Sequence, residues 1–179
     1  MGTTALLVID MFNPYRHEDA ERLQHSAAGI VGPLAGLVRR AAASGEGLVV
    51  YVNDNLGDFS ATRDDLVERA LAGARPDLIE PLVPAPDCAF LTKIRHSAFY
   101  GTPLEYLLSH RDVDSVLLTG QVTEQCVLYT ALDAYIRHIP LAVVTDAVAH
   151  IDPELGAAAV RMMRRNMRAD LVTAGECFA

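Results

Sequence analysis

The sequence predicts an α/β fold with one six-stranded, mainly parallel, doubly wound (Rossmann-like) sheet and helices on both faces. Apolar runs such as Thr4–Ile9 are continuous rather than alternating, which is typical of parallel strands buried on both faces. Segments with apolar residues at helical spacing alternate with these runs along the chain. The 179 residues, 51 % of them hydrophobic, suit a single domain over residues 1–179 with a sizeable core.

The first half of the chain is expected to begin with strand 4–9, which ends at Asp10, and a loop over residues 11–15. A helix should follow over residues 17–43, with Gly32-Pro33 as a candidate break. The next elements are expected to be a turn at 44–47, a strand at 48–52, a polar loop at 53–58, a helix at 64–71, and an irregular, proline-rich surface connection at 73–87.

The second half is organised around a central strand, Val116–Thr119, which stops at Gly120. Apolar residues return at helical spacing from Glu124, so a helix to about His138 should follow this strand directly. The other elements are expected to be a strand at 88–92, a loop at 94–101, a helix at 102–110 with Pro103 in its first turn, a strand at 141–145, a loop at 146–152, a helix at 153–167 and a strand at 169–173.

Cys126 falls in the first turn of the helix that follows the central strand. The first N–H groups of a helix lack intrahelical partners, and this end carries partial positive charge. Both features favour the thiolate, so the pKa of this thiol is expected to fall from about 8.5 into the range of roughly 3.5 to 7.5. The same N–H groups suit an oxyanion. A buried cysteine that acts as a small apolar side chain is the alternative.

Three reactive side chains are expected at one edge of the sheet, because Asp10, Lys93 and Cys126 each follow a strand. A carboxylate near a thiol can take its proton, and an ammonium beside a thiol stabilises the thiolate. The set supplies a nucleophile, a base and an electrostatic partner. Taken singly, an aspartate at a strand end is often a turn former, and a lysine there is often a solvated edge residue.

Composition narrows the class of partner. The net charge of −8 and the lack of a basic face argue against nucleic-acid binding. Three widely spaced cysteines, without a CxxC pair, argue against a disulfide framework or a structural zinc site and favour a reducing, cytoplasmic setting. No signal peptide and no membrane span are expected, and no cofactor is implied.

Three segments together carry a resemblance to a known family: residues 6–13 (LLVIDMFN), residues 93–99 (KIRHSAF, with Thr102 and Leu104 beyond), and residues 118–127 (LTGQVTEQCV, continuing through 130–134). In these motifs the chain resembles the isochorismatase-like cysteine hydrolase superfamily, which includes nicotinamidases and N-carbamoylsarcosine amidohydrolases. The family's order of strands and helices covers nearly the whole chain.

The resemblance implies that Asp10, Lys93 and Cys126 form a catalytic triad. It implies a cis peptide between Gln121 and Val122, and an oxyanion hole made by the N–H groups of Val122 and Cys126. Because isochorismatases that cleave a vinyl ether lack this cysteine, it implies hydrolysis of a C–N bond in a small amide or ureide through a thioester. It also implies a homodimer or homotetramer.

The chain departs from the nicotinamidase pattern after the second strand. Nicotinamidases carry a metal site there, with Asp-x-His and a further histidine, whereas this chain has Asn53-Asp54-Asn55 and no histidine between His25 and His96. No metal site is therefore expected. Asp54 and Asp58 are expected to be solvated loop carboxylates, with weak cation binding as the alternative.

The substrate is expected to contact side chains in the loops that follow the first, second and third strands and on the nucleophile helix. Phe12 and Phe59 are candidates for an apolar wall, and Asn53 for hydrogen bonding to a polar substrate or for forming the turn. The other candidates are Asn13, Asn55, His96, Phe99 and Tyr129. Three alternative functions stay open: hydrolysis of another bond type, metabolite binding without catalysis, and a redox thiol switch.

Overall fold

The computed structural model describes residues 2–178, in which six parallel strands form one sheet. The strands are β1 (Thr3–Ile9), β2 (Gly47–Asp54), β3 (Ala89–Lys93), β4 (Val113–Gln121), β5 (Leu141–Ala149) and β6 (Asp170–Val172). Their order is β3-β2-β1-β4-β5-β6, and every neighbouring pair is parallel. The predicted fold class is confirmed. The winding direction reverses between β1 and β4, which is where ligands bind in open sheets of this kind.

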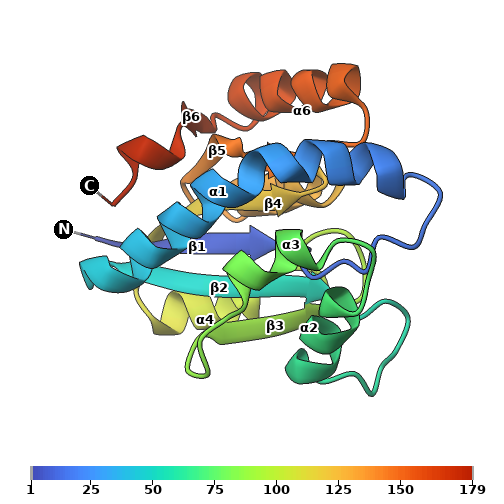
Figure 1. Cartoon of the computed structure of the whole chain (residues 1–179). Helices are drawn as coiled ribbons and strands as arrows, with labels where there is room; N and C mark the ends of the chain where they lie inside the picture. Colours follow the sequence, from blue (N-terminus) through green and yellow to red (C-terminus); the bar gives the residue numbers. More distant parts are fainter. Residues whose placement is uncertain (1, 179) are drawn as a thin grey trace.

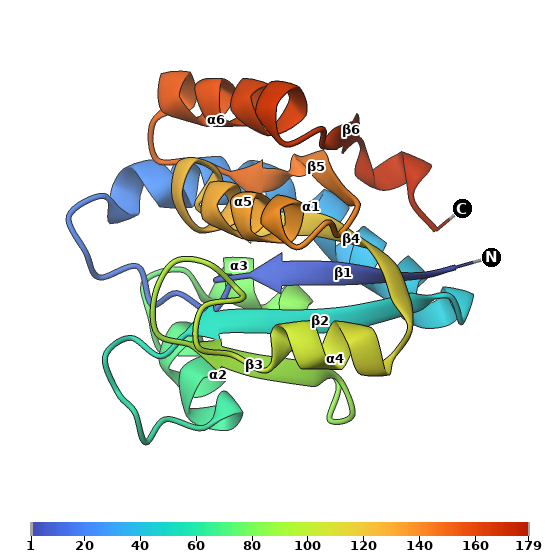
Figure 2. The same ribbon diagram turned by 180° about the vertical axis from the view of Figure 1, so that it is seen from behind.

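Helices cover both faces of the sheet. They are α1 (Ala20–Ser44), α2 (Arg63–Leu71), α3 (Pro76–Ile79), α4 (Leu104–His110), α5 (Leu128–Ile136) and α6 (Pro153–Asn166). Figure 1 shows α1 and α3 over one face, and Figure 2, from behind, shows α4 and α5 over the other. None of the helices within residues 2–178 combines the length and the apolar character needed to cross a bilayer.

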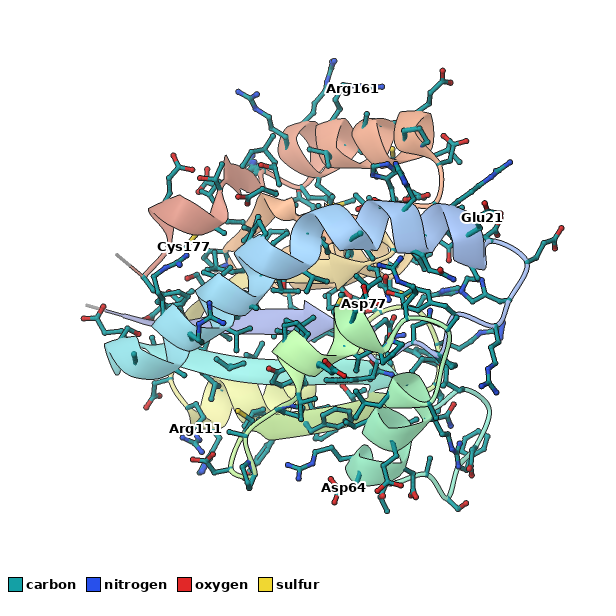
Figure 3. The ribbon with its side chains drawn as sticks, in the orientation of Figure 1. Glu21, Asp64, Asp77, Arg111, Arg161 and Cys177 are labelled. Carbon is teal, nitrogen blue, oxygen red and sulfur yellow. The ribbon has the colours of Figure 1, made fainter. Side chains whose placement is uncertain are left out.

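The two-sided cover explains why the apolar run in β1 is continuous. Leu6 and Val8 pack into the core beneath α1, whereas Ala5, Leu7 and Ile9 pack into the core beneath α4 and α5. All five side chains are buried because successive side chains of a strand point to opposite faces. Charged side chains such as Arg161 on α6 and Asp64 on α2 project from the outside of these layers (Figure 3).

Helix α1 begins three residues later than predicted and is continuous through Pro33. Proline in a helix interior removes one backbone hydrogen bond, so a break was the local expectation. Packing overrides that preference, because Ile30, Val31 and Leu34 are buried on both sides of the proline and fix the helix against the sheet.

Two other local predictions were wrong. The proline-rich stretch is not wholly irregular surface, because α3 and the 3₁₀ segment Glu80–Leu82 form within it and bury Leu78, Ile79 and Leu82. Strand β5 also continues beyond residue 145 to Ala149, past a register shift opposite Leu118 and Gly120 of β4. A loop was expected from Asp146 onward, but Asp146 lies within the strand, where its carboxylate accepts a hydrogen bond from the Ala174 N–H (2.7 Å).

Gly120 illustrates how closely β1 and β4 approach at the switch point. Its φ is +100°, and a Cβ atom there would clash with the Ile9 carbonyl oxygen and lie 2.7 Å from the Ile9 nitrogen. We expect Gly120→Ala to lower the free energy of unfolding in urea by about 3 kcal/mol or more, because backbone atoms cannot move aside cheaply.

Gly29 provides the matched control for this substitution. It lies inside α1, and among residues 2–178 no atom outside the helix backbone lies within 4 Å of the position that a Cβ atom would occupy there. Gly29→Ala should leave stability unchanged or raise it by up to about 1 kcal/mol, because alanine is the better helix former. Equal effects of the two substitutions would contradict the close approach at Gly120.

Candidate active site

Asp10 follows β1 directly and has an unusual backbone conformation, with φ of +52°. Positive φ is uncommon outside glycine, although aspartate adopts it more readily than most residues. Hydrogen bonds fix the residue from several sides. Its N–H donates to the Val52 carbonyl (2.9 Å), its carbonyl accepts from Gln121 Nε2 (2.7 Å), and its Oδ1 accepts from the Asp54 N–H (2.7 Å). The carboxylate is therefore held in one place.

Lys93 is the last residue of β3, and its side chain is fully buried. The side chain reaches past the end of β2 toward β1 and β4. Its Nζ lies 2.9 Å from Asp10 Oδ2, 3.4 Å from Asp54 Oδ2 and 3.7 Å from Cys126 Sγ. The lysine therefore connects the carboxyl ends of four neighbouring strands.

Cys126 follows β4 on a π-helical turn, Thr123–Val127, which leads into α5. An α-helix was predicted over these residues, whereas the structure has the wider π-helical turn. The Val127 N–H donates to the Val122 carbonyl (3.1 Å), five residues back, as a π-turn requires. The peptide bond between Gln121 and Val122 is cis, at the position that the family resemblance implied.

These side chains meet in a cavity of about 310 Å³ at the switch point between β1 and β4. Asp10, Asp54, Gln121, Gln125 and Cys126 are among the residues that line it. This volume lies near the lower end of the range for small-molecule sites. In Figures 1 and 3 this edge of the sheet is the one to which the β1 arrow points, on the same side as Glu21 at the amino end of α1.

The charges of the cluster are strongly coupled. Burial raises the pKa of the Asp10 carboxyl, although the Lys93 ammonium opposes this shift. Burial also raises the pKa of the Cys126 thiol far above its ordinary value, and the Asp10 carboxylate adds to the increase. Burial alone would lower the pKa of Lys93, but the negative charge of Asp10 raises it overall. The ammonium therefore stays charged, and the thiol stays neutral while Asp10 is ionised.

The predicted lowering of the Cys126 pKa is thus wrong for this site. The prediction weighed the amino end of the helix, whose partial charge is about half a unit, and the Lys93 ammonium beside the thiol. It did not include the desolvation of a buried thiol or the full negative charge of Asp10. A buried cysteine beside an ionised carboxylate needs that carboxylate as a proton acceptor before it can act as a nucleophile.

The structure brings some predicted pocket residues to the cavity and not others. Phe12, Asn13, Asn53 and His96 line it. The Asn53 amide bonds the backbone of Phe12, accepting from its N–H (2.9 Å) and donating to its carbonyl (3.2 Å), so it supports the loop after β1. His96 Nδ1 lies 4.0 Å from Cys126 Sγ.

Three other predicted contacts lie outside the cavity lining. Phe59 is 83 % exposed, so its assignment to an apolar wall was wrong. Phe99 is buried beneath the Arg137 guanidinium, which lies 4.9 Å from the centre of its ring. Tyr129 packs edge-on against the outer side of His96, with ring centres 5.3 Å apart. The direction of loop side chains cannot be inferred from strand ends alone.

Asp54 plays a larger part in the site than the sequence suggested. It is the last residue of β2 and pairs with Lys93, so it is not a solvated loop carboxylate. The rule that located Asp10 also applies to it, since it too ends a strand. The neighbouring Asn55 side chain is buried and accepts from the Gly57 N–H (3.0 Å), which makes it a turn former. Asp58 is paired with Arg69 on the surface (2.5 Å).

The Gln121 side chain was not anticipated as part of the site. Its Nε2 holds the Asp10 carbonyl, and its Oε1 accepts from the Tyr15 hydroxyl (3.2 Å). Nothing in the spacing of apolar residues signals this contact. Within residues 2–178, no group of three or more His, Cys, Asp or Glu side chains is placed to hold a metal ion.

The chain matches the model of the isochorismatase domain family over residues 4–176. It is 31 % identical to the uncharacterised isochorismatase family protein YaaI of Bacillus subtilis over 94 % of this chain and 93 % of that protein. It is 30 % identical to the ureidoacrylate amidohydrolase RutB of Methylorubrum extorquens over 84 % of this chain and 71 % of that protein.

A solved structure extends the comparison to three dimensions. The N-carbamoylsarcosine amidase of Thermoplasma acidophilum superposes with a TM-score of 0.75 at 31 % identity, over 96 % of each chain.

The raised pKa of Cys126 makes a direct prediction about reactivity. The thiol should remain protonated at neutral pH, so alkylation of Cys126 by iodoacetamide should be slow near pH 7 and should still accelerate beyond about pH 9. Mass spectrometry after timed quenching gives the rate at each pH, with Cys88 in the same digest as an internal comparison. A plateau below pH 7 would show a resting thiolate instead.

The buried ion pair makes a second prediction. Lys93→Met should lower the free energy of unfolding by about 3–5 kcal/mol at pH 7, because it leaves the Asp10 carboxylate buried without its cation. Adding Asp10→Asn to this variant should restore part of the loss, since the uncompensated charge disappears. Urea unfolding of the two single variants and the double variant measures the coupling, and strictly additive effects would count against it.

Proposed function

Because this chain belongs to the isochorismatase family of hydrolases, we propose that it is a cysteine-dependent hydrolase of a C–N bond in a small amide or ureide, acting through a thioester. We propose that residues 1–179 act as one domain with Asp10, Lys93 and Cys126 as the catalytic triad. A cytoplasmic setting is part of the proposal and is consistent with three free cysteines.

One observation carries the proposal: a single buried ammonium lies 2.9 Å from the Asp10 carboxylate and 3.7 Å from the Cys126 sulfur, and both of these residues line one small cavity. Burying a lysine is costly unless opposite charges surround it. A site that keeps a thiol, a carboxylate and an ammonium together has the parts needed for nucleophilic catalysis. A binding module has no need of this combination.

The reaction begins with proton transfer from the Cys126 thiol to the Asp10 carboxylate. The thiol and that carboxylate lie against the same Lys93 ammonium, and the raised pKa of the carboxyl makes it a stronger base than an exposed aspartate. The sulfur then attacks the carbonyl carbon of the substrate. Lys93 keeps its positive charge next to the pair throughout, so the negative charge that moves from Asp10 to the sulfur stays compensated.

The negative charge next develops on the substrate oxygen. In the proposal, the N–H groups of Val122 and Cys126 donate hydrogen bonds to it, and neither group donates to a described residue outside its own segment. Collapse of the tetrahedral intermediate expels the amine, which takes the proton from Asp10 and leaves the thioester. Asp10 then removes a proton from water as the water oxygen attacks the thioester carbonyl. The C–S bond breaks, the acid is released, and the sulfur takes the proton back from Asp10.

The chemistry of the relatives supports a C–N bond as the target. The names of two of them describe an amidohydrolase and an amidase. The cavity volume of about 310 Å³ suits a substrate of small size. We also propose that the chain forms a homodimer or homotetramer, since large apolar side chains are exposed on α5 and α6, namely Leu132, Ile136, Leu155 and Met162.

The proposal predicts that Cys126→Ala abolishes ammonia or amine release from a panel of small primary amides and ureides. Loss of the nucleophile should reduce kcat by about 10⁴-fold or more, while the matched variant Cys88→Ala should keep full activity. Coupled ammonia detection gives the rates, and mass spectrometry of acid-quenched protein should show an acyl adduct on Cys126. Equal activity in the Cys126→Ala variant would refute the mechanism.

A further inference from the structure

We propose that the cavity accepts small amides or ureides that are neutral or positively charged and rejects those that carry a carboxylate or another anion, with Asp19 and Asp54 setting this preference. The inference rests on the proposed function and narrows its substrate class, and it separates this chain from the two relatives above, whose names give the carboxylates ureidoacrylate and N-carbamoylsarcosine as substrates. It follows from the distribution of charge around the cavity rather than from the catalytic groups alone.

Carboxylates dominate the ionisable side chains at the surface of the cavity. Asp10, Asp19 and Asp54 all line it, whereas no lysine or arginine within residues 2–178 does so. The Lys93 ammonium lies beneath this surface, with its side chain fully buried. An anionic group on a substrate would therefore meet three carboxylates and no accessible cation. In a partly desolvated site, such like-charge contacts are expensive.

Lys93 is not available to neutralise a substrate anion. An ammonium has three donors, and Nζ already faces the Asp10 carboxylate at 2.9 Å, the Asp54 carboxylate at 3.4 Å and the Cys126 sulfur at 3.7 Å. Two carboxylates share this single positive charge. The three carboxylates and one ammonium carry a net negative charge before any substrate enters.

Contacts to both of its oxygens fix the position of the Asp54 carboxylate. Its Oδ1 accepts from the Leu56 N–H (2.9 Å), and its Oδ2 is paired with Lys93. About a third of the side chain remains exposed to the cavity. Its charge therefore reaches a bound substrate from a fixed position.

Asp19 adds a charge that no partner compensates. It occupies the position before α1, yet its side chain makes no capping hydrogen bond. No ion pair or hydrogen bond joins its carboxylate to another residue in the described part of the chain. The amino end of a helix would otherwise attract an anion, but Asp19 already supplies negative charge there. A protonated amine on a substrate would form an ion pair with this carboxylate.

Two histidines also line the cavity, and both already face other groups. His17 Nε2 lies 3.5 Å from the Asn13 amide nitrogen, and His96 Nδ1 lies 4.0 Å from the Cys126 sulfur. All rates are compared at one pH of about 8, so that the imidazoles contribute alike in every variant.

The first test uses Cys126 itself as the probe and needs no turnover. Iodoacetamide and iodoacetate are nearly equal in size and differ in charge. The alkylation rate of Cys126 with iodoacetamide, divided by its rate with iodoacetate, should be about tenfold larger in the folded chain than in the same chain unfolded in urea. Because both reagents attack the same thiolate, a change in its pKa cancels from the ratio. An equal ratio in the two states would overturn the inference.

Three variants test which carboxylates cause the difference in alkylation rate between the two reagents. Asp54→Asn and Asp19→Asn should each lower the ratio several-fold, whatever they do to the absolute rates. Asp58→Asn is the matched control, because Asp58 lies in the loop just beyond Asp54, is paired with Arg69 and does not line the cavity. A ratio that stays unchanged in both test variants, or one that falls equally in the control, would contradict the assignment.

The second test uses three substrates of matched length: butanamide (neutral), β-alaninamide (cationic) and succinamate (anionic). We expect kcat/KM for succinamate to be lower than for the other two by about tenfold or more, and this gap to narrow in Asp54→Asn. Faster cleavage of succinamate would overturn the inference and leave the proposed function intact. No cleavage of any amide would overturn the proposed function, while the alkylation ratio would still decide the charge preference.

Discussion

The buried contact between the Lys93 ammonium and the Asp10 carboxylate is the constraint on which the rest of the site depends. A lysine with a fully buried side chain cannot stay charged without close anions, and the structure supplies two of them at 2.9 and 3.4 Å. The same contacts fix the partners. Asp10 is also held by hydrogen bonds from the Asp54 N–H and the Gln121 side chain, so its carboxylate has a fixed position beside the lysine that contacts the Cys126 sulfur.

The parallel sheet makes this contact possible. In the order β3-β2-β1-β4, the ends of four adjacent strands carry Lys93, Asp54, Asp10 and, one turn beyond, Cys126. One long side chain is enough to span them. Helices bury both faces of the sheet (Figures 1 and 2), so the carboxyl edge is left for a cavity, which lies at the reversal between β1 and β4. The close approach at Gly120 keeps the two central strands in this register.

The sequence predicted the features that depend on neighbouring residues and missed those that depend on contacts between distant ones. Strand periodicity located Asp10, Lys93 and the Cys126 turn, because a strand end fixes where a residue emerges. It did not give the direction of loop side chains, so Phe59 was placed wrongly, and it offered no sign of the Gln121 contact with Asp10. Strand periodicity also could not predict the pKa of Cys126, because burial and neighbouring charges depend on residues far apart in the chain.

The net negative charge of the site links the protonated state of the resting thiol to the proton transfer that begins the proposed reaction. One ammonium compensates one of the two carboxylates around it, so forming a thiolate would add a charge with no counterion unless Asp10 takes the proton at the same time. Proton transfer moves the negative charge without creating more of it. The acid released by the proposed hydrolysis is itself an anion, and in a cavity lined by Asp10, Asp19 and Asp54 it would be repelled as it forms. The charge distribution that we propose to disfavour anionic substrates would therefore also favour release of the product.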